Sequence, residues 1–258
     1  EGIGVIIDIV PNHVAVGGDD NAWWLDVLEN GPASVHAETF DIDWNPPAPE
    51  LAGQVLLPVL GDQYGRVLEA GELKLDFDEQ AGEFWIHYYD HRFPIDPRLY
   101  PQVFAAAPAP QALAHQPARL AEWQQVGSLI DAFGALPARD ADAQARAVRQ
   151  RDRVVHKQRL AQLAASVPEV GEWIAECRRV LNGQPGQAGS FDALDRLLRA
   201  QAYRLAYWRV AGDDVNYRRF FDINTLAGVR VDREPVFDAT HRTIFRWLEE
   251  GKLDGLRI

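Results

Sequence analysis

The residues of this sequence best suited to chemistry are an aspartate, an asparagine and a histidine near its start. Asp8, Asn12 and His13 lie at or just beyond the end of the apolar run 4–10. Enzymes built on parallel strands hold their reactive side chains at this end of a strand. A buried aspartate in such a run needs a partner, for which an arginine is expected, and the histidine can donate to a ligand hydroxyl. Alternatively, these residues only organise the loop through local hydrogen bonds, and their spacing leaves both interpretations open.

A second polar group ends a predicted hairpin. Residues 88–92 carry Asp90, His91 and Arg92 beside two tyrosines, and their polar tips are candidates for ligand contact. A zinc site at His87 and His91 is rejected, because two histidines four positions apart on a strand lack a third ligand. We expect no metal and no cofactor.

The composition favours a neutral, sugar-like ligand. The net charge is −12, which disfavours nucleic acid and anionic membranes as partners. Eight Trp, seven Tyr and eleven Phe suit sugars, which present apolar C–H faces and hydroxyl rims together. Trp23 and Trp24 either stack on a glucose ring or belong to the core. Arg218 and Arg219 could form an anion site. The acidic composition of the chain favours the alternative that they pair with carboxylates.

The elements that position these residues alternate between strand and helix patterns. The β-branched run 4–10 predicts a strand buried on both faces, and a short aromatic helix is expected near 23–29 within a long loop region, 12–58. Alternating apolar residues predict a hairpin over about 71–93. Helices are expected over 139–166, 168–181 and 235–250. Another helix is expected to begin at a cap at Ser190 and to carry Leu205 and Trp208. The helix over 139–166 is expected to form a solvent-facing arm with a thin apolar stripe: Ala147, Val148, Val154, Val155, Leu160 and Leu163.

The order strand, long excursion, helix, strand predicts a right-handed βαβ unit of an α/β protein with an inserted subdomain. Residues 255–258 are typical of a strand that has just begun. Two parallel strands cannot close a barrel or cover their own edges, and the chain has no Met and begins with Glu. We therefore expect it to be a piece of a longer protein.

Its location is expected to be the cytoplasm. The single cysteine, Cys177, excludes an internal disulfide and a cysteine-based zinc cluster. The sequence contains no apolar run of the roughly 18 residues that a membrane span needs, and its first 30 residues do not have the pattern of a signal peptide.

Seven motifs resemble the α-amylase superfamily of glycoside hydrolases, family 13, and within it the maltooligosyltrehalose synthases. DIVPNH at 8–13 and DGLRI at 254–258 are similar to the first and second signature regions of the superfamily. Between them lie five motifs of the narrower family: NAWWLDVLENGP (21–32), FDIDW (40–44), VLLPVLGDQYG (55–65), YYDHRFP (88–94) and RRFFDINTLAGVRV (218–231). The likeness covers nearly the whole chain and is weakest over about 105–190.

The resemblance implies a place for this chain in a (β/α)8 TIM barrel. Residues 1–13 would form the third barrel strand, 14–220 a large inserted α+β subdomain with its hairpin at about 71–93 and helices at about 139–208, and 221–258 the return to the barrel and the start of the fourth strand. The remainder of the same barrel is then a missing partner.

The resemblance also implies site residues. Asp8, Asn12 and His13 would surround the sugar at the cleavage site, and Arg257 would steady a catalytic aspartate two positions later, just after Ile258. No catalytic residue is therefore expected within the chain, since the acid/base glutamate and third carboxylate of the family lie on later strands. Further candidates for substrate binding are Trp23, Trp24, Asp62, Tyr64, Asp90, His91, Arg92, Asp222 and Asn224, of which Asp62 and Asp222 suit loop fixing or sugar binding better than nucleophilic attack.

The activity implied is the isomerisation of the reducing-end α-1,4 bond of a maltooligosaccharide to an α,α-1,1 bond. Two other hypotheses stay open. A related α-glucan hydrolase or trehalohydrolase would share the first motif but admit water to the pocket, and a glucan-binding module would perform no chemistry. We expect the chain by itself to be inactive.

Overall fold

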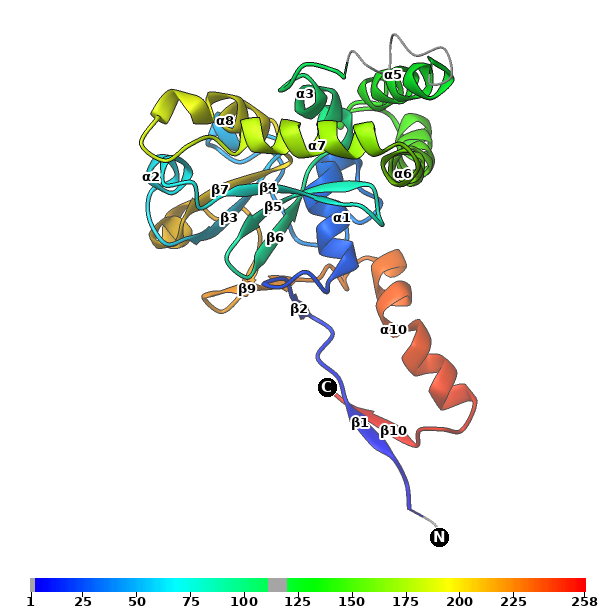
Figure 1. Ribbon diagram of the computed structural model, residues 1–258. Helices are drawn as coiled ribbons and strands as arrows, with labels where there is room; N and C mark the ends of the chain where they lie inside the picture. The colour runs from blue at the N-terminus through cyan, green and yellow to red at the C-terminus, as the bar shows by residue number, and fades with distance from the viewer. Residues whose placement is uncertain (1–2, 111–119) are drawn as a thin grey trace.

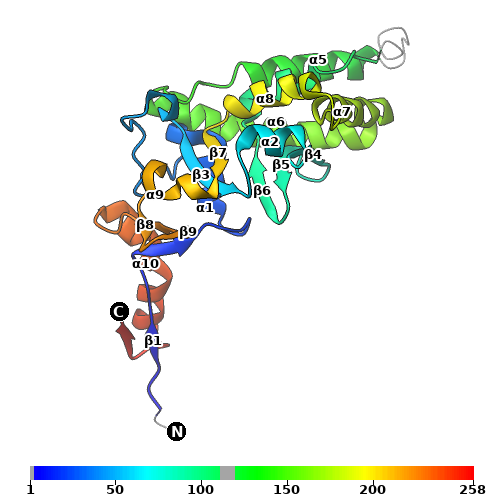
Figure 2. The same ribbon diagram turned by 90° about the vertical axis from the view of Figure 1, so that its left-hand side faces the viewer.

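The computed structural model describes residues 3–110 and 120–258. Figure 1 shows two parts: a body in which helices cover small sheets, and an extension that carries both ends of the chain. The same separation is visible after a quarter turn (Figure 2). None of the described helices is long and apolar enough to cross a membrane.

Two small sheets form the centre of the body. Strands β3 (Val55–Leu60) and β7 (Tyr203–Tyr207) pair in parallel. Strands β4 (Lys74–Asp78), β5 (Glu83–Tyr88) and β6 (His91–Pro94) form an antiparallel sheet in the order β4-β5-β6. The predicted hairpin is confirmed, and its alternating apolar residues are buried: Leu73, Leu75, Phe77, Phe84, Ile86 and Tyr88.

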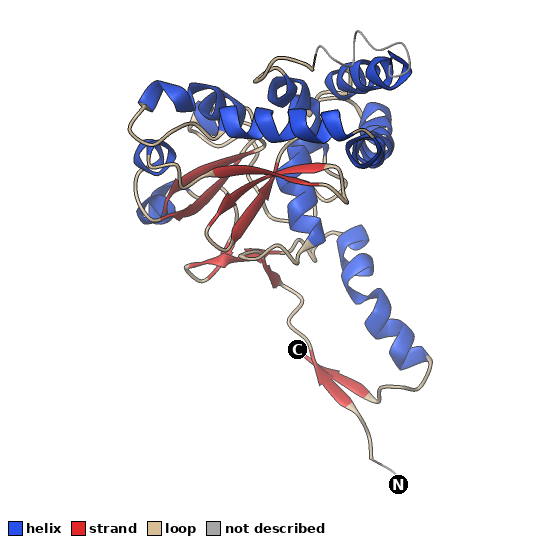
Figure 3. Ribbon diagram, viewed as in Figure 1, coloured by secondary structure: helices blue, strands red, loops and turns tan. Residues whose placement is uncertain are grey.

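Helices pack on these sheets (Figure 3). The described helices of the body are α1 (Ala22–Asn30), α2 (Tyr64–Glu69), α3 (Tyr100–Phe104), α5 (Leu120–Gly134), α6 (Ala143–Ser166), α7 (Pro168–Leu181), α8 (Asp192–Arg199) and α9 (Ala211–Asp214). Short 3₁₀ turns lie at Gly31–Ala33, Pro49–Leu51, Pro97–Leu99, Ala188–Phe191 and Trp208–Val210. Asn21 caps α1 through a 3.1 Å bond from the Trp24 amide, and Asp142 caps α6 through a 2.8 Å bond from the Ala145 amide.

The buried face of α6 matches the predicted apolar stripe only at its end. Leu160 and Leu163 are buried as predicted, whereas Val154 and Val155 are exposed. Earlier in the helix the buried positions are Arg149, Arg153 and Lys157, spaced four apart on one face. These cations meet buried acidic and polar groups from distant parts of the chain, so α6 packs into the body as an ionic face and is not a solvent-facing arm.

The partners of these cations come mainly from α1. The carboxylate of Glu29 accepts hydrogen bonds from both Arg153 and Lys157. Burial opposes ionisation of Glu29, but the charges of Lys157 and Arg153 outweigh it and hold its pKa below the ordinary value. Arg149 donates to Asp96 at 2.6 Å. Each buried charge is therefore compensated, as a low-dielectric interior requires.

The prediction for residues 190–208 was wrong in two respects. Ser190 does not cap a helix: its hydroxyl bonds to backbone groups of Gln184 and Gln187. Leu205 lies on strand β7 and not on a helix that continues through Trp208. The helix is shorter because β7 pairs with β3, a strand that lies inside the region predicted to be loop.

A third sheet closes the base of the body. Strand β2 (His13–Ala15) pairs antiparallel with β9 (Ile223–Gly228), which pairs with β8 (Arg219–Phe220). The pairing brings the two ends of the long excursion together. Just after β2, the chain runs so close to β9 that a Cβ on Gly17 would lie 2.6 Å from Cγ2 of Thr225, so glycine is needed there.

The extension contains the predicted parallel pair. Strand β1 (Ile6–Asp8) pairs in parallel with β10 (Gly255–Arg257), with α10 (Glu234–Glu249) between them in sequence. Helix α10 is confirmed, and Gly251 follows it with a φ of +66°. The expected burial of β1 is not found: Ile6 is 68% exposed. The fold is mixed α/β, and the described strands form no closed barrel.

Candidate functional site

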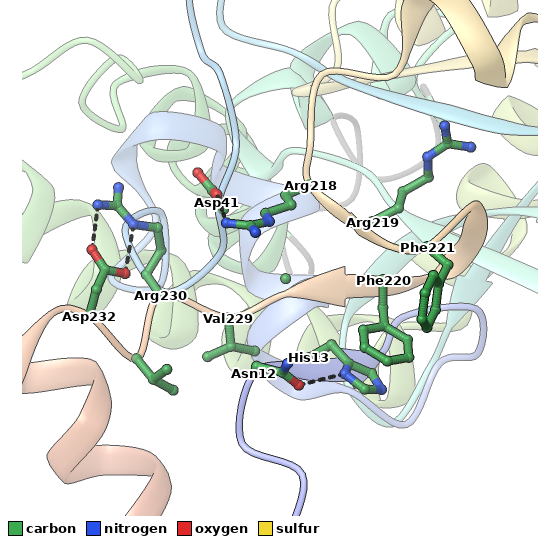
Figure 4. Close-up of a pocket in the computed structure, with 12 residues that line it drawn as sticks. Asn12, His13, Asp41, Arg218, Arg219, Phe220, Phe221, Val229, Arg230 and Asp232 are labelled. Carbon is green, nitrogen blue, oxygen red and sulfur yellow. Dashed lines mark hydrogen bonds and ion pairs between the residues drawn. The ribbon is translucent and has the colours of Figure 1, made fainter.

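The pocket nearest the first motif lies between β2 and the β8–β9 hairpin and has a volume of about 660 Å³. Figure 4 shows the side chains around it. Asn12 and His13 line it from one side, and residues of β8, β9 and the following loop line the other: Arg218, Arg219, Phe220, Phe221, Gly228, Val229, Arg230, Val231 and Asp232, with Asp41 from a neighbouring loop. We call this the His13 pocket.

His13 is oriented by two neighbours. Its Nδ1 lies 2.8 Å from Oδ1 of Asn12 (Figure 4). With the proton on Nδ1, the ring donates to Asn12, and Nε2 becomes the acceptor nitrogen. A neutral His13 would then accept from a sugar hydroxyl, and its Nε2 would donate only as an imidazolium. Its ring also stacks on Phe220, with centroids 3.7 Å apart and planes at 15°.

The aromatic stack continues beyond Phe220. Phe221 packs edge-on against Phe220 at 4.6 Å and is 80% exposed. Its φ of +52° is unfavourable for a bulky residue. From the sequence, the two arginines of the RRFF segment were weighed as an anion site or carboxylate partners, but its two phenylalanines were recognised only as part of a family motif. Two adjacent aromatic residues beside charged ones were the available signal, but the contact of Phe220 with a histidine more than 200 positions earlier was not visible in the pattern.

The charged groups around the His13 pocket neutralise one another. Arg218 lies 3.8 Å from Asp41, and Arg230 lies 2.8 Å from Asp232. The hydrogen bond from Arg230 is the main cause that lowers the pKa of Asp232. Arg219 lies 3.7 Å from Asp222. The predicted pairing of Arg218 and Arg219 with carboxylates is therefore found, and the pocket suits a neutral ligand with many hydroxyl groups more than an anion.

Residues of the first and last motifs also lie side by side on the parallel strands β1 and β10. Asp8 is opposite Arg257 in the β1–β10 register, and their side chains form an ion pair. The expected pairing is present, although the side chains are 61% and 76% exposed and not buried. Neither lines the His13 pocket. The four residues of the two signature regions thus form two pairs, Asp8 with Arg257 and Asn12 with His13, at and beyond the carboxyl end of β1.

Four of the lesser candidates line a second pocket of about 230 Å³. His91 and Arg92 reach it from β6, and Asn224 reaches it from β9. Asn224 also accepts a 2.6 Å bond from Arg219 through its side-chain oxygen. Trp24 forms part of the wall of this pocket but is only 1% exposed, so it is a core residue and cannot stack on a sugar.

The other candidates do not gather at either pocket. Trp23 stacks on His36 at 4.9 Å. Tyr64 donates a 2.8 Å hydrogen bond to Asp195, and burial is the largest cause that raises its pKa.

The remaining acidic candidates lie at turns. Asp62 is exposed and accepts a 2.7 Å bond from the Gln63 amide, which lowers its pKa and supports the loop-fixing interpretation. Asp90 is exposed at the tip between β5 and β6. Asp222 is fully exposed at the tip between β8 and β9, 3.7 Å from Arg219.

The described residues contain no group of three His, Cys, Asp or Glu side chains that could hold a metal ion. His87 and His91, the pair weighed for zinc, belong to different environments. His87 lies 3.9 Å from Asp76, whereas His91 stacks near Tyr88 and Phe93.

Comparison with known proteins shows what this chain is similar to. No protein-family model matches the chain. The chain is 30% identical, from end to end, to a Mycobacterium tuberculosis protein assigned as a maltooligosyl trehalose synthase, of which it covers 20%. Its whole length is similar to one segment of maltooligosyltrehalose synthases. The solved maltooligosyltrehalose synthase of Arthrobacter ramosus is 31% identical over 99% of this chain and 20% of its own, with a TM-score of 0.53. A second solved maltooligosyl trehalose synthase, 22% identical with a TM-score of 0.53, covers 100% of this chain and 21% of its own and shows the same fold.

The chain spans about a fifth of the length of these maltooligosyltrehalose synthases. The resemblance expected from the motifs is therefore found by whole-chain comparison. Because the comparison covers one segment only, it shows what this chain is similar to and assigns no roles to single residues.

Proposed function

We propose that this chain supplies sugar-positioning residues to a (1→4)-α-D-glucan 1-α-D-glucosylmutase of trehalose biosynthesis. The substrate is a maltooligosaccharide, and the reaction moves its reducing-end glucose from an α-1,4 to an α,α-1,1 linkage. One observation carries the proposal: the His13 pocket, with an oriented imidazole, an aromatic stack and paired charges, lies in a chain that matches these synthases throughout.

The chemistry requires two carboxylates about 5–5.5 Å apart, one as nucleophile and one as proton donor. In the His13 pocket, Asp41 and Asp232 are both paired with arginines, and the family resemblance gives neither of them a catalytic role. On that resemblance we assign the nucleophile to an aspartate following Ile258 and the proton donor to a later glutamate. Asp8, Asn12, His13 and Arg257 would position the sugar and the nucleophile.

The reaction then proceeds in two displacements. The nucleophilic carboxylate attacks C1 of the penultimate glucosyl unit, the C1–O4 bond breaks, and the acid donates a proton to the leaving oxygen. The released glucose stays bound, turns and attacks the same C1 through its anomeric hydroxyl. This breaks the bond from C1 to the carboxylate, which leaves as the free anion, and the proton of the hydroxyl returns to the acid/base group. No water is consumed, so the pocket must hold the glucose and exclude water between the two steps.

The extension fits the strand neighbourhood of a (β/α)8 barrel. We assign β1 to the third strand and β10 to the start of the fourth, with 14–220 as the inserted subdomain and 221–258 as the return. The parallel β1–β10 pair, joined through α10, supports this assignment. So do apolar side chains that remain exposed on or beside β1 and on α10 and that further barrel elements would cover: Ile3, Ile6, Val10, Phe245 and Trp247. We also propose a reducing compartment, the cytoplasm, because the one cysteine, Cys177, is buried and unpaired.

The test is an assay of the full-length protein with maltopentaose. The proposal predicts loss of reducing ends without release of glucose. His13→Ala should lower kcat/KM by roughly 100-fold, because mispositioning near the reacting bond costs about that factor. His87→Ala, which changes a histidine away from both pockets, is the matched control and should behave as wild type. Release of glucose as the main product would instead indicate a hydrolase, and binding without turnover a glucan-binding module.

A further inference from the structure

The tip of the β8–β9 hairpin has a backbone conformation that its residues do not favour. Phe220 pairs with Ile223, so Phe221 and Asp222 form a two-residue connection between the strands. Phe221 has a φ of +52°, in the left-handed region where turns of this length favour glycine or asparagine. Its side chain is 80% exposed, so burial does not compensate for the strain. A strained and exposed aromatic residue indicates a function other than folding.

The contacts of Phe221 show what this conformation achieves. Phe221 packs edge-on against Phe220, with ring centroids 4.6 Å apart, and within the described residues Phe220 is the one aromatic ring that it contacts. Phe220 in turn stacks on His13, with the two ring planes at 15° (Figure 4). Both phenylalanines line the His13 pocket. The hairpin tip therefore supports the imidazole through two successive rings.

The stack supplies a restraint that His13 would otherwise lack. Oδ1 of Asn12 lies 2.8 Å from Nδ1 of His13, but Asn12 is exposed, and a single hydrogen bond lets the ring rotate about the bond. The residue opposite His13 on β9 is Gly228, which has no side chain to hold the ring. Phe220 lies nearly parallel to the imidazole and so fixes its plane. The direction in which Nε2 points therefore depends on Phe220.

The hairpin is itself held together close to its tip. Arg219 donates a 2.6 Å hydrogen bond to the side-chain oxygen of Asn224. The hydroxyl of Tyr217 donates another, also of 2.6 Å, to the Asn224 carbonyl. Both bonds join β8 or the segment just before it to β9, and the Arg219 side chain is only 15% exposed. The tip is therefore braced, as a group that orients a reactive side chain needs to be.

We propose that the tip of the β8–β9 hairpin positions His13 for the reaction: Phe220 fixes the plane of the imidazole, and Phe221 holds Phe220 in place. Both phenylalanines are positioning residues, because they act through His13. The inference rests on the proposed function for the reaction that His13 serves. A misplaced group at the reacting bond lowers the rate strongly, which explains why strain at Phe221 is retained.

The experiment is a mutant cycle in the full-length protein with maltopentaose as substrate. Phe220→Leu should lower kcat/KM about tenfold, less than the roughly 100-fold expected for His13→Ala, because the imidazole is misplaced but still present. Phe220→Tyr keeps the ring and should stay within about twofold of wild type. In a His13→Ala background, Phe220→Leu should change kcat/KM by less than about twofold, because a residue that acts through His13 has no effect without it.

Phe221→Gly tests the same inference if Phe220→Leu fails to fold. Glycine adopts a positive φ without strain, so the midpoint of urea unfolding should not fall. The loss of one aromatic contact should nevertheless lower kcat/KM about threefold, and this loss should disappear in the His13→Ala background. A purely structural residue would not lower the rate while leaving stability intact.

Phe237→Leu is the matched control, because Phe237 stacks on a different histidine, His241 of α10, with ring centroids 4.1 Å apart. It should keep the kcat/KM of the wild type. The inference is wrong if Phe220→Leu gives the same kcat/KM as this control. It is also wrong if Phe220→Leu or Phe221→Gly lowers kcat/KM as much without His13 as with it, since the phenylalanines would then act independently of the imidazole.

Failure of the proposed function is recognised separately, as absence of isomerised product in the wild type. In that case calorimetric titration with maltopentaose decides the inference. Binding that is weakened by Phe220→Leu in the wild type but not in His13→Ala supports the positioning role, and unchanged or absent binding refutes it.

Discussion

Replacing Glu29 by glutamine should destabilise the body more than any surface charge substitution. Glu29 lies on α1, its side chain is 7% exposed, and it bridges Arg153 and Lys157 of α6. Glutamine keeps the size of the side chain but removes the charge. The substitution therefore isolates the electrostatic interaction between the two helices.

The expected magnitude follows from the two hydrogen bonds that the substitution weakens. A hydrogen bond to a charged group contributes about 1.5–3 kcal/mol, and Glu29 accepts two. Each cation keeps another carboxylate, since Arg153 also pairs with Asp26 and Lys157 lies 3.1 Å from Glu83. We therefore expect the lower end of this range for the pair, a decrease of about 3 kcal/mol in the free energy of unfolding.

The effect should depend on pH in a defined direction. Burial opposes ionisation of Glu29, but Lys157 and Arg153 outweigh it, so its native pKa lies below the ordinary value of 4.5. A lowered native pKa contributes stability that is fully present above about 4.5 and is lost as the pH falls through the native value. The difference between wild type and Glu29→Gln should thus be constant near neutral pH and shrink in acid.

Urea unfolding followed by tryptophan fluorescence measures this difference. Glu176→Gln is the control, because it removes the same group from an exposed pair with Arg179 and should leave the unfolding midpoint unchanged. Two results would contradict the stabilising role of the ionic interaction between α1 and α6. One is that Glu29→Gln shifts the unfolding midpoint no more than Glu176→Gln does. The other is that the destabilisation by Glu29→Gln stays constant down to strongly acid pH.

Two further predictions concern the packed body. Burial raises the pKa of Cys177 to about 11, so its thiol should react with a disulfide reagent at about pH 8 at least 100-fold more slowly in the native than in the urea-unfolded protein; equal rates would contradict this burial. Gly82 has a φ of +67°, and a Cβ there would lie 2.0 Å from the carbonyl oxygen of Lys157, so Gly82→Ala should cost at least about 3 kcal/mol in urea unfolding. Gly53→Ala, at a similar φ with no atom within 4 Å of the added Cβ, should cost only about 1 kcal/mol, and equal destabilisation by the two variants would show that the close approach to α6 is not the cause.

The elements that were predictable from the sequence are those whose pattern is local. The hairpin of β4 and β5 follows from alternating apolar residues around a turn, and α10 follows from its helix formers and Gly251. One long-range pairing was also predictable: the parallel β1–β10 pair followed from the order of strand, helix and strand and the known geometry of such connections.

The features that were missed depend on partners distant in sequence. Arg153 and Lys157 suggest an exposed helix face until Glu29, more than 120 positions earlier, is placed beside them. Strands β3 and β7 pair although they are about 150 residues apart in sequence. The proline at position 58 also makes the sequence of β3 resemble a loop.

The candidate site shows the same limit. The Asn12–His13 hydrogen bond was within reach of the sequence because the residues are adjacent. An arginine partner for Asp8 was also expected, but the strand register that makes this partner Arg257 comes from the structure. The stack of His13 on Phe220 could not be predicted, because neither segment alone shows the β2–β9 pairing that creates it.

The proposed isomerisation can be followed at the reducing-end carbon itself. Maltopentaose labelled with carbon-13 at C1 of its reducing glucose is incubated with the full-length protein, and the anomeric signals are recorded by NMR. Isomerisation moves the label from the free anomeric position into an α,α-1,1 linkage, with the oligosaccharide length unchanged. Accumulation of labelled free glucose, or a label that never leaves the reducing end, would show that the protein is not a glucosylmutase.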